Sequence, residues 1–196
     1  RISELALRVR EALRREGISV DIRPEYTYQG VRSYRVSTEK ILSQGDTFHV
    51  FVAFNGEAYE MNKDFLTPGT VLVYDSPGGD FQPEAIEGVI QYPVPMTKIS
   101  KVDLGTPISK NMVALGAVMQ LFSFPADSLR DLVKAKFKKK GESVVEMNLL
   151  ALEAGAEYVR SQLKKVDRYY VQPAQPREDR IMLSGNEAIG LGALVA

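Results

Sequence analysis

The chain has 196 residues, of which 44% are hydrophobic and 26% charged, a balance typical of a folded protein with one or two domains and a sizeable core. Its 25 Lys and Arg residues are matched by 25 Asp and Glu residues, so no overall field favours nucleic acid or an anionic membrane surface. It contains no Cys, which excludes disulfides, thiolate zinc sites and iron–sulfur ligation within these residues.

The absence of membrane and secretion signals in the sequence predicts a cytoplasmic protein. No apolar run reaches the roughly 18 residues of a membrane span, and the Arg-rich start is amphipathic rather than a signal peptide. We therefore expect binding to neither membrane nor nucleic acid. The single His, His49, lies in an apolar run, where a hydrogen-bonded structural role is expected rather than catalysis.

The first part of the chain predicts alternating helices and strands. Apolar residues at helical spacing predict a helix over residues 1–16, and a short strand follows at 18–22 and ends before Pro24. Residues 25–32 predict a loop and 33–37 a strand. The run FHVFVAF at 48–54 predicts the central strand, because strands covered on both faces by helices are almost continuously apolar.

The next segments predict a crossover unit. Asn55 is expected to cap a short helix over 55–66, and TVLVY at 70–74 follows as another buried strand. Residues 75–83 predict a surface loop, and 88–92 a last strand that Pro93 stops. Together these elements predict an α/β fold of three layers, with a mostly parallel sheet flanked by helices.

Three helices are expected after residue 105. In the first, Thr106 is the predicted cap and Pro107 the first helical residue. The second begins at Asp127 and is broken at Gly141, and the third covers 142–163. The residues expected to face inward are Ile108, Met112, Leu115, Met119 and Phe122, then Leu129, Leu132, Val133 and Phe137, then Val145, Leu149, Leu152 and Val159.

The end of the chain predicts a second domain. Residues 164–183 have the mixed charge and prolines of a linker. The following stretch, SGNEAIGLGALVA at 184–196, predicts the start of a further helix that needs a packing partner. We therefore expect the chain to be part of a larger protein.

The catalytic inventory is thin, so this segment alone is expected to be inactive. The sequence has no HExxH, P-loop, GxGxxG or nucleophile-elbow motif. Asn111 and Asn148 interrupt apolar helical patterns, and each is expected to be buried and bonded to another element, the alternative being a ligand-facing role. The lysines of residues 134–140 predict a solvated helix end, or a site for an anionic cofactor or an acidic electron carrier.

The loop near Arg32 is a further candidate site. It follows a predicted strand at the position where open α/β sheets bind ligands, and it contains Gln29, Gly30 and Arg32, of which Arg32 could pair with a phosphate. An ordinary surface loop is the alternative.

Four segments taken together carry a family resemblance. VAFN (52–55), NMVALG (111–116), FKKKGESVVEMNLLALEAG (137–155) and SGNEAIGLGALVA (184–196) resemble the alpha subunit of 2-oxoacid:ferredoxin oxidoreductases of the 2-oxoglutarate type. In that subunit a gamma-type domain precedes the thiamine-associated domain. The resemblance implies a gamma-type domain at 1–163, a linker at 164–183 and the start of the thiamine-associated, pyrimidine-binding domain at 184–196, with the family's first strand and Gly-rich loop expected before Arg1.

The resemblance also implies a reaction. It is the coenzyme A-dependent oxidative decarboxylation of a 2-oxoacid to an acyl-CoA and CO2, with electrons passed to ferredoxin. The complex would use thiamine diphosphate, Mg2+, a 4Fe-4S cluster and coenzyme A, and a beta subunit of the hetero-oligomer would carry the thiamine and the cluster. Among possible substrates, 2-oxoglutarate is favoured over pyruvate and branched-chain oxoacids.

For this segment itself the resemblance implies no catalytic residue, no metal and no cofactor bound by the segment alone. The candidate residues facing coenzyme A are Gln29, Gly30, Arg32, Lys110 and Asn111. Two alternatives stay open: a non-catalytic scaffold or interaction domain, and a generic nucleotide-binding α/β domain.

Overall fold

A computed structural model describes residues 23–26, 32–35, 47–76, 82–171 and 193 of the chain. The helix expected at 1–16 and the strand expected at 18–22 lie outside the described residues, as does all of 184–196 except Ala193. The elements are, in chain order, β1 (Arg23–Tyr26), β2 (Arg32–Arg35), β3 (Val50–Ala53), α2 (Gly56–Glu60), η1 (Lys63–Phe65), β4 (Val71–Asp75), β5 (Ile90–Val94), η2 (Lys98–Asp103), η3 (Pro107–Ser109), α3 (Lys110–Leu121), α4 (Ala126–Phe137), η4 (Lys138–Lys140) and α5 (Glu142–Gln162).

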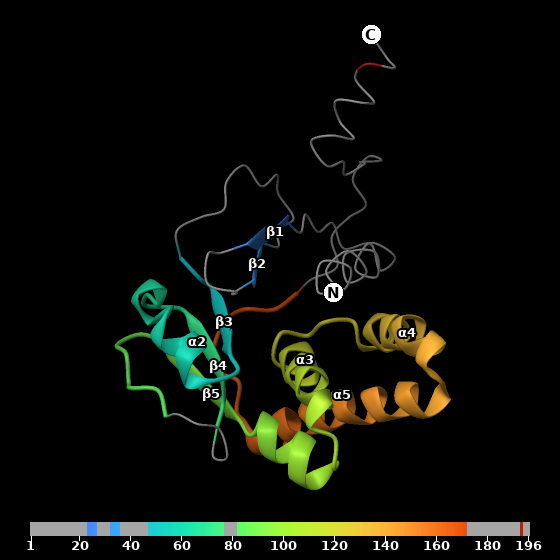
Figure 1. Cartoon of the computed structure of the whole chain (residues 1–196). Coiled ribbons are helices and arrows are strands. Elements are labelled where there is room, and N and C mark those ends of the chain that lie inside the picture. Colours follow the sequence, from blue (N-terminus) through green and yellow to red (C-terminus); the bar gives the residue numbers. More distant parts are fainter. Residues whose placement is uncertain (1–22, 27–31, 36–46, 77–81, 172–192, 194–196) are drawn as a thin grey trace.

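The fold is α/β and is built on a parallel three-stranded sheet in the order β3-β4-β5 (Figure 1). The middle strand of this sheet is β4, and all five of its residues are buried. The prediction that 48–54 forms the central strand is therefore wrong for the described sheet. The apolar run suggested burial on both faces, but in β3 buried Phe51 and Ala53 alternate with half-buried Val50 and Val52.

Alternation along β4 separates two cores. Val71 and Val73 point to the core shared with α3 and α5, whereas Leu72 and Tyr74 point to the core on the α2 side. Figure 1 shows α2 on one side of the sheet and α3 with α5 on the other, which gives the three expected layers. Helix α4 packs against α3 and α5, with Leu129 as its buried anchor beside Met119 and Leu152.

Helices α3 and α5 cross with their backbones in close approach. A Cβ placed on Gly116 would lie 1.8 Å from the Leu152 carbonyl oxygen, and one placed on Gly155 would lie 2.0 Å from the Val113 carbonyl oxygen. Real side chains do not fit at such distances, so both positions require glycine. The two helices therefore pack as one tightly joined pair.

The predicted strands are partly correct. Residues 33–37 overlap β2, but β2 pairs antiparallel with β1, which lies where the strand at 18–22 was expected to end and the loop at 25–32 to begin. Pro24 lies within β1, and an outer strand tolerates a residue without an N–H group. For the same reason β5 extends past Pro93 to Val94, two residues beyond the predicted end, because β5 is an outer strand of the described sheet.

The predicted helices are found with small differences at their starts. Asn55 caps α2 as predicted, with its Oδ1 accepting a hydrogen bond from Ala58 N at 2.9 Å. Thr106 does not cap the next helix with its side chain, since a 3₁₀ turn precedes α3. Ile108 lies in that turn and is 96% exposed, so its predicted inward position is wrong.

The inward faces of the last two helices agree with the prediction in most positions. Leu129, Val133, Leu152 and Val159 are buried. Val145 and Leu149, near the start of α5, are only half-buried. Gly141 separates η4 from α5 with a φ of 103°, the left-handed backbone that favours glycine.

The segment after α5, residues 163–171, is held against the sheet, and we call it the strap. The Tyr92 hydroxyl in β5 donates to Asp167 Oδ2 at 2.8 Å and accepts from Val166 N at 2.7 Å. At the far end, Val171 N donates to the Phe122 carbonyl at 2.7 Å. The strap thus joins β5 to the C-terminal end of α3.

Candidate functional site

The carboxyl ends of the three parallel strands bring together side chains and backbone groups from distant parts of the sequence. Phe54 directly follows β3, Asp75 ends β4, Thr97 lies shortly after β5, and Lys110 is the first residue of α3. We call these four residues the edge cluster. Open α/β sheets bind their ligands at this edge, so the edge cluster is the candidate functional site.

Asp75 is the buried centre of the edge cluster. Its side chain is 0% exposed. Its Oδ1 accepts a hydrogen bond from Thr97 N at 3.0 Å, and its Oδ2 accepts one from Thr97 Oγ1 and pairs with Lys110 Nζ at 2.6 Å. Both carboxylate oxygens therefore have donors, as burial of a charged group requires.

Lys110 connects the buried carboxylate to the surface. Besides its ion pair with Asp75, its Nζ donates to the Phe54 carbonyl at 2.8 Å and lies 5.9 Å from the centroid of the Phe54 ring. The side chain is 26% exposed. A lysine ammonium has three donors, so these two bonds leave one for a further partner. The site can therefore hold an anionic group.

Sequence reasoning found Lys110 but missed Asp75. Asp75 was predicted to lie in a surface loop over 75–83, whereas it is the last, fully buried residue of β4. A signal was available, because a carboxylate directly after the apolar run TVLVY lies at the carboxyl end of a parallel strand, where ligand sites form.

The two asparagines differ from their predicted positions. Asn111 is exposed in the first turn of α3, whereas Met112 and Val113 next to it are buried. Asn148 is half-buried, and its Nδ2 donates to the Val144 carbonyl of its own helix at 2.7 Å. The prediction that both are buried and tie their helices to other elements is therefore wrong.

The other predicted site residues are not brought to the edge cluster by any described contact. Gln29 and Gly30 lie outside the described residues, and Arg32 begins β2, where only the backbone is described. His49 is exposed, and its ring meets that of Tyr169 in the strap at 5.7 Å between centroids. His49 directly precedes β3, so it lies at the amino ends of the parallel strands, whereas the edge cluster lies at their carboxyl ends.

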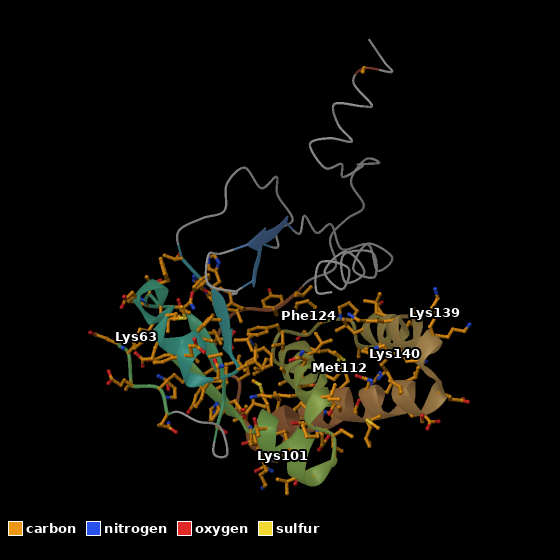
Figure 2. The ribbon with its side chains drawn as sticks, in the orientation of Figure 1. Lys63, Lys101, Met112, Phe124, Lys139 and Lys140 are labelled. Atoms are coloured by element: carbon orange, nitrogen blue, oxygen red, sulfur yellow. The ribbon has the colours of Figure 1, made fainter. Side chains whose placement is uncertain are left out.

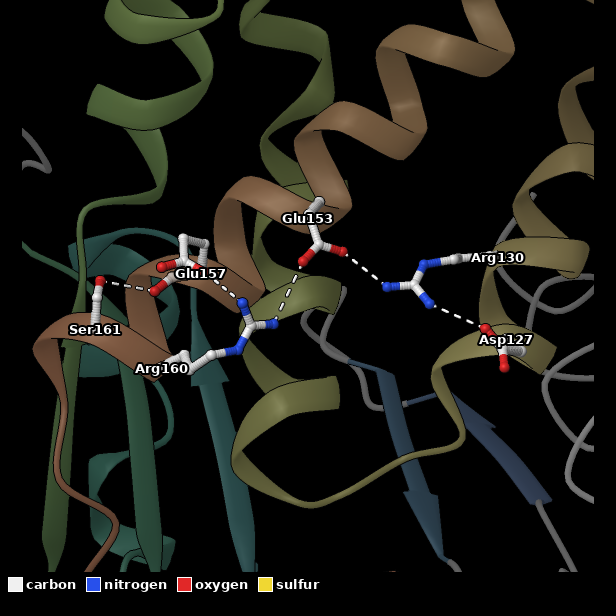
Figure 3. Close-up of polar contacts among 6 residues, drawn as sticks. All are labelled: Asp127, Arg130, Glu153, Glu157, Arg160 and Ser161. Carbon is white, nitrogen blue, oxygen red and sulfur yellow. Dashed lines mark hydrogen bonds and ion pairs between the residues drawn. The ribbon is translucent and has the colours of Figure 1, made fainter.

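Charged side chains on the helices form lysine clusters and ion pairs outside the edge cluster. Figure 2 shows Lys139 and Lys140 at the end of α4 away from the sheet, and it labels Lys101, which lies in η2. In Figure 3, Arg130 of α4 bridges Asp127 at 3.0 Å and Glu153 of α5 at 2.9 Å, and Glu153 also meets Arg160 at 3.3 Å. The hydrogen bond from Arg130 is the main cause that lowers the pKa of Glu153.

The described part of the chain has neither a metal-binding cluster nor a membrane-spanning helix. Within them, no three His, Asp or Glu side chains come close enough together to hold a metal ion. None of the described helices has the length and apolar composition of a membrane span.

Known proteins resemble the chain over most of its length. The family model for pyruvate ferredoxin/flavodoxin oxidoreductase matches residues 11–158. Ketoisovalerate oxidoreductase subunit VorA of Methanothermobacter thermautotrophicus is 33% identical over 132 residues, which are 66% of this chain and 27% of VorA. 2-Oxoglutarate oxidoreductase subunit KorA of Mycobacterium tuberculosis is 27% identical over 99% of this chain and 33% of KorA. The chain thus spans a third or less of the length of these relatives.

Solved structures of other proteins have a similar fold. A 2-oxoglutarate:ferredoxin oxidoreductase from Magnetococcus marinus, with 2-oxoglutarate, coenzyme A and succinyl-CoA bound, is 42% identical with a TM-score of 0.81, over 97% of this chain and 34% of that chain. The gamma subunit of a keto/oxoacid ferredoxin oxidoreductase from Geobacter sulfurreducens is 23% identical with a TM-score of 0.59, over 80% of this chain and 89% of that chain. The second likeness concerns the fold alone.

Proposed function

The chain belongs to the pyruvate ferredoxin/flavodoxin oxidoreductase family, and we propose that it forms the gamma-type part of a 2-oxoacid:ferredoxin oxidoreductase. The proposed reaction is the oxidative decarboxylation of a 2-oxoacid with coenzyme A, which yields an acyl-CoA, CO2 and two electrons for ferredoxin. One observation carries the proposal: the 42% identity and TM-score of 0.81 with the Magnetococcus marinus enzyme over 97% of this chain.

The proposed substrate is 2-oxoglutarate. It is bound in the Magnetococcus marinus structure and gives the KorA relative its name. The VorA relatives are named for ketoisovalerate, but their similarity covers only 66% of this chain.

Coenzyme A is the proposed ligand of the gamma-type domain, which the proposal places at 1–163. A linker over 164–183 and the start of the thiamine-associated domain at 184–196 complete the proposed organisation. The residues proposed to lie near coenzyme A are Gln29, Gly30, Arg32, Lys110 and Asn111. The chemistry of the described edge supports this assignment, because the partly exposed ammonium of Lys110 and the exposed amide of Asn111 suit an anionic, polar ligand.

The remaining cofactors are assigned to other parts of the complex. The 196 residues contain no Cys, so the thiolates that hold a 4Fe-4S cluster do not come from them. We assign the cluster, thiamine diphosphate and Mg2+ to a beta subunit in a cytoplasmic hetero-oligomer. Relatives named as single subunits, such as KorC of Methanocaldococcus jannaschii, support an assembly of several chains.

The test is an assay of the full-length protein assembled with its partner subunit. We expect ferredoxin reduction that requires both coenzyme A and 2-oxoglutarate and is faster than with ketoisovalerate or pyruvate. Faster ferredoxin reduction with ketoisovalerate would change the proposed substrate but leave the proposed reaction unchanged. A complex with intact iron–sulfur absorption that reduces ferredoxin with none of the three 2-oxoacids would contradict the proposed function.

A further inference from the structure

Within the proposed function, we infer that Lys110 supports coenzyme A binding as a positioning residue that acts through Asp75, and that its charge stays paired with Asp75 and does not take the coenzyme's phosphates as its main partner. The inference rests on the proposed function, because it concerns the same ligand. The sequence alone does not distinguish whether Lys110 binds the phosphates or holds the surrounding segments in place.

The ammonium group of Lys110 already has an ion-pair partner. Its Nζ lies 2.6 Å from Asp75 Oδ2, and the Asp75 side chain is 0% exposed. To bind a phosphate as its main partner, the ammonium would have to leave a carboxylate that no water can reach. An unpaired buried charge is strongly unfavourable, so the ion pair persists when the ligand binds.

The second argument concerns what the ion pair holds together. Through Lys110 Nζ it fixes the Phe54 carbonyl at 2.8 Å, and through Asp75 it fixes Thr97 N at 3.0 Å. The pair therefore sets the distances between the end of β3, the end of β4, the turn after β5 and the start of α3. These four segments form the edge at which α/β sheets bind ligands.

The third argument is that the neighbouring residue is free to contact a ligand. Asn111 follows Lys110 in the first turn of α3 and is exposed. Its position depends on where α3 begins, and the Lys110–Asp75 ion pair fixes that start. Lys110 thus presents Asn111 to the ligand while its own charge stays with the carboxylate.

The experiment compares four variants of the complete enzyme complex. They are Lys110→Met, Asp75→Asn, the double variant Lys110→Met with Asp75→Asn, and Lys101→Met as the control that removes one exposed positive charge near the same end of the molecule. Titration calorimetry gives the Kd for coenzyme A at several salt concentrations, and steady-state kinetics give KM for coenzyme A and for 2-oxoglutarate.

If Lys110 is a positioning residue, Lys110→Met weakens coenzyme A binding about tenfold or more, because an unpaired carboxylate disturbs the edge. The double variant removes that carboxylate, so its Kd returns to within about threefold of the wild type, with an unchanged salt dependence. KM for 2-oxoglutarate stays constant, whereas a general loss of structure would change both KM values. Lys101→Met binds as the wild type does.

Three results would overturn the inference: a double variant as weak as Lys110→Met, a reduced salt dependence once Lys110 is gone, or no effect of Lys110→Met at all. If Lys110→Met does not assemble, the double variant decides between the two roles by itself. A wild-type complex that turns over a 2-oxoacid but does not bind coenzyme A would remove the proposed ligand, and the inference with it.

Discussion

The glycine crossing of α3 and α5 makes a quantitative prediction for Gly155→Ala. The added Cβ would lie 2.0 Å from the Val113 carbonyl oxygen and 3.0 Å from Val113 Cα, and both are backbone atoms. An ordinary contact begins at 3.4 Å, so the helices must separate by about 1.4 Å. A gap of about 1 Å already forfeits up to half of the dispersion energy of the atoms that line it.

The expected magnitude follows from two opposing effects. Overpacking of a well-packed core costs about 1–3 kcal/mol, and this crossing belongs at the upper end because backbone cannot rotate away. Alanine favours the helix over glycine by about 1 kcal/mol. We therefore expect Gly155→Ala to lower the free energy of unfolding by about 2 kcal/mol and the Tm by about 4–8 °C.

The assay is thermal unfolding followed by circular dichroism, with Glu146→Ala as the matched control. Glu146 lies on α5 and is exposed, so its replacement should change stability by less than about 0.5 kcal/mol. The double variant Gly116→Ala with Gly155→Ala should lose less than the sum of the single losses, because both act on one crossing. A Gly155→Ala variant that melts at or above the wild-type temperature would refute the reasoning.

Three further predictions concern other parts of the molecule. Tyr92→Phe removes the hydroxyl that joins β5 to Asp167, so the strap should become more susceptible to limited proteolysis, and equal cleavage of variant and wild type would contradict this role. Burial alone would raise the pKa of Asp167, but hydrogen bonds from Lys165, Tyr92 and a backbone N–H outweigh it, so the folded-state pKa lies below the ordinary value of an Asp carboxyl. The stability that Asp167 contributes is therefore fully present above that value and is lost as the pH falls through the folded-state pKa. In urea unfolding, the wild type should be more stable than Asp167→Asn at neutral pH, and this difference should shrink below about pH 4. Ile108→Ser should leave the Tm unchanged, because the side chain is 96% exposed, and a clear decrease would show that it is packed.

The sequence predicted those parts of the fold that depend on local patterns. The apolar run TVLVY, the capping residue Asn55 and the break at Gly141 each act within a few residues, and the structure has β4, α2 and the start of α5 where these signals predict them. Longer-range features were missed. Nothing near position 48 shows that β3 lies at the side of the described sheet, because strand order depends on pairing between distant segments.

The candidate site shows the same division. Lys110 was recognisable beside the NMVALG helix, but its partners Phe54 and Asp75 lie 56 and 35 positions earlier and come close only through the parallel sheet. The neighbours of Asp75 give opposing signals, since the apolar run TVLVY before it indicates a buried strand end, whereas Ser, Pro and Gly after it are typical of a surface loop. Asn111 was misplaced because Ile108 and Met112 on either side of it were both expected to face inward, whereas Ile108 lies exposed in the 3₁₀ turn before α3.

Helix α3 has a consequence for how motion can travel through the protein. It begins at the edge cluster and ends beside Phe122, whose carbonyl binds the strap, and its 12 residues span about 18 Å. The glycine crossing packs the backbone of α3 closely against that of α5. We therefore expect a ligand that shifts the first turn of α3 to change the contact between Phe122 and the strap as well.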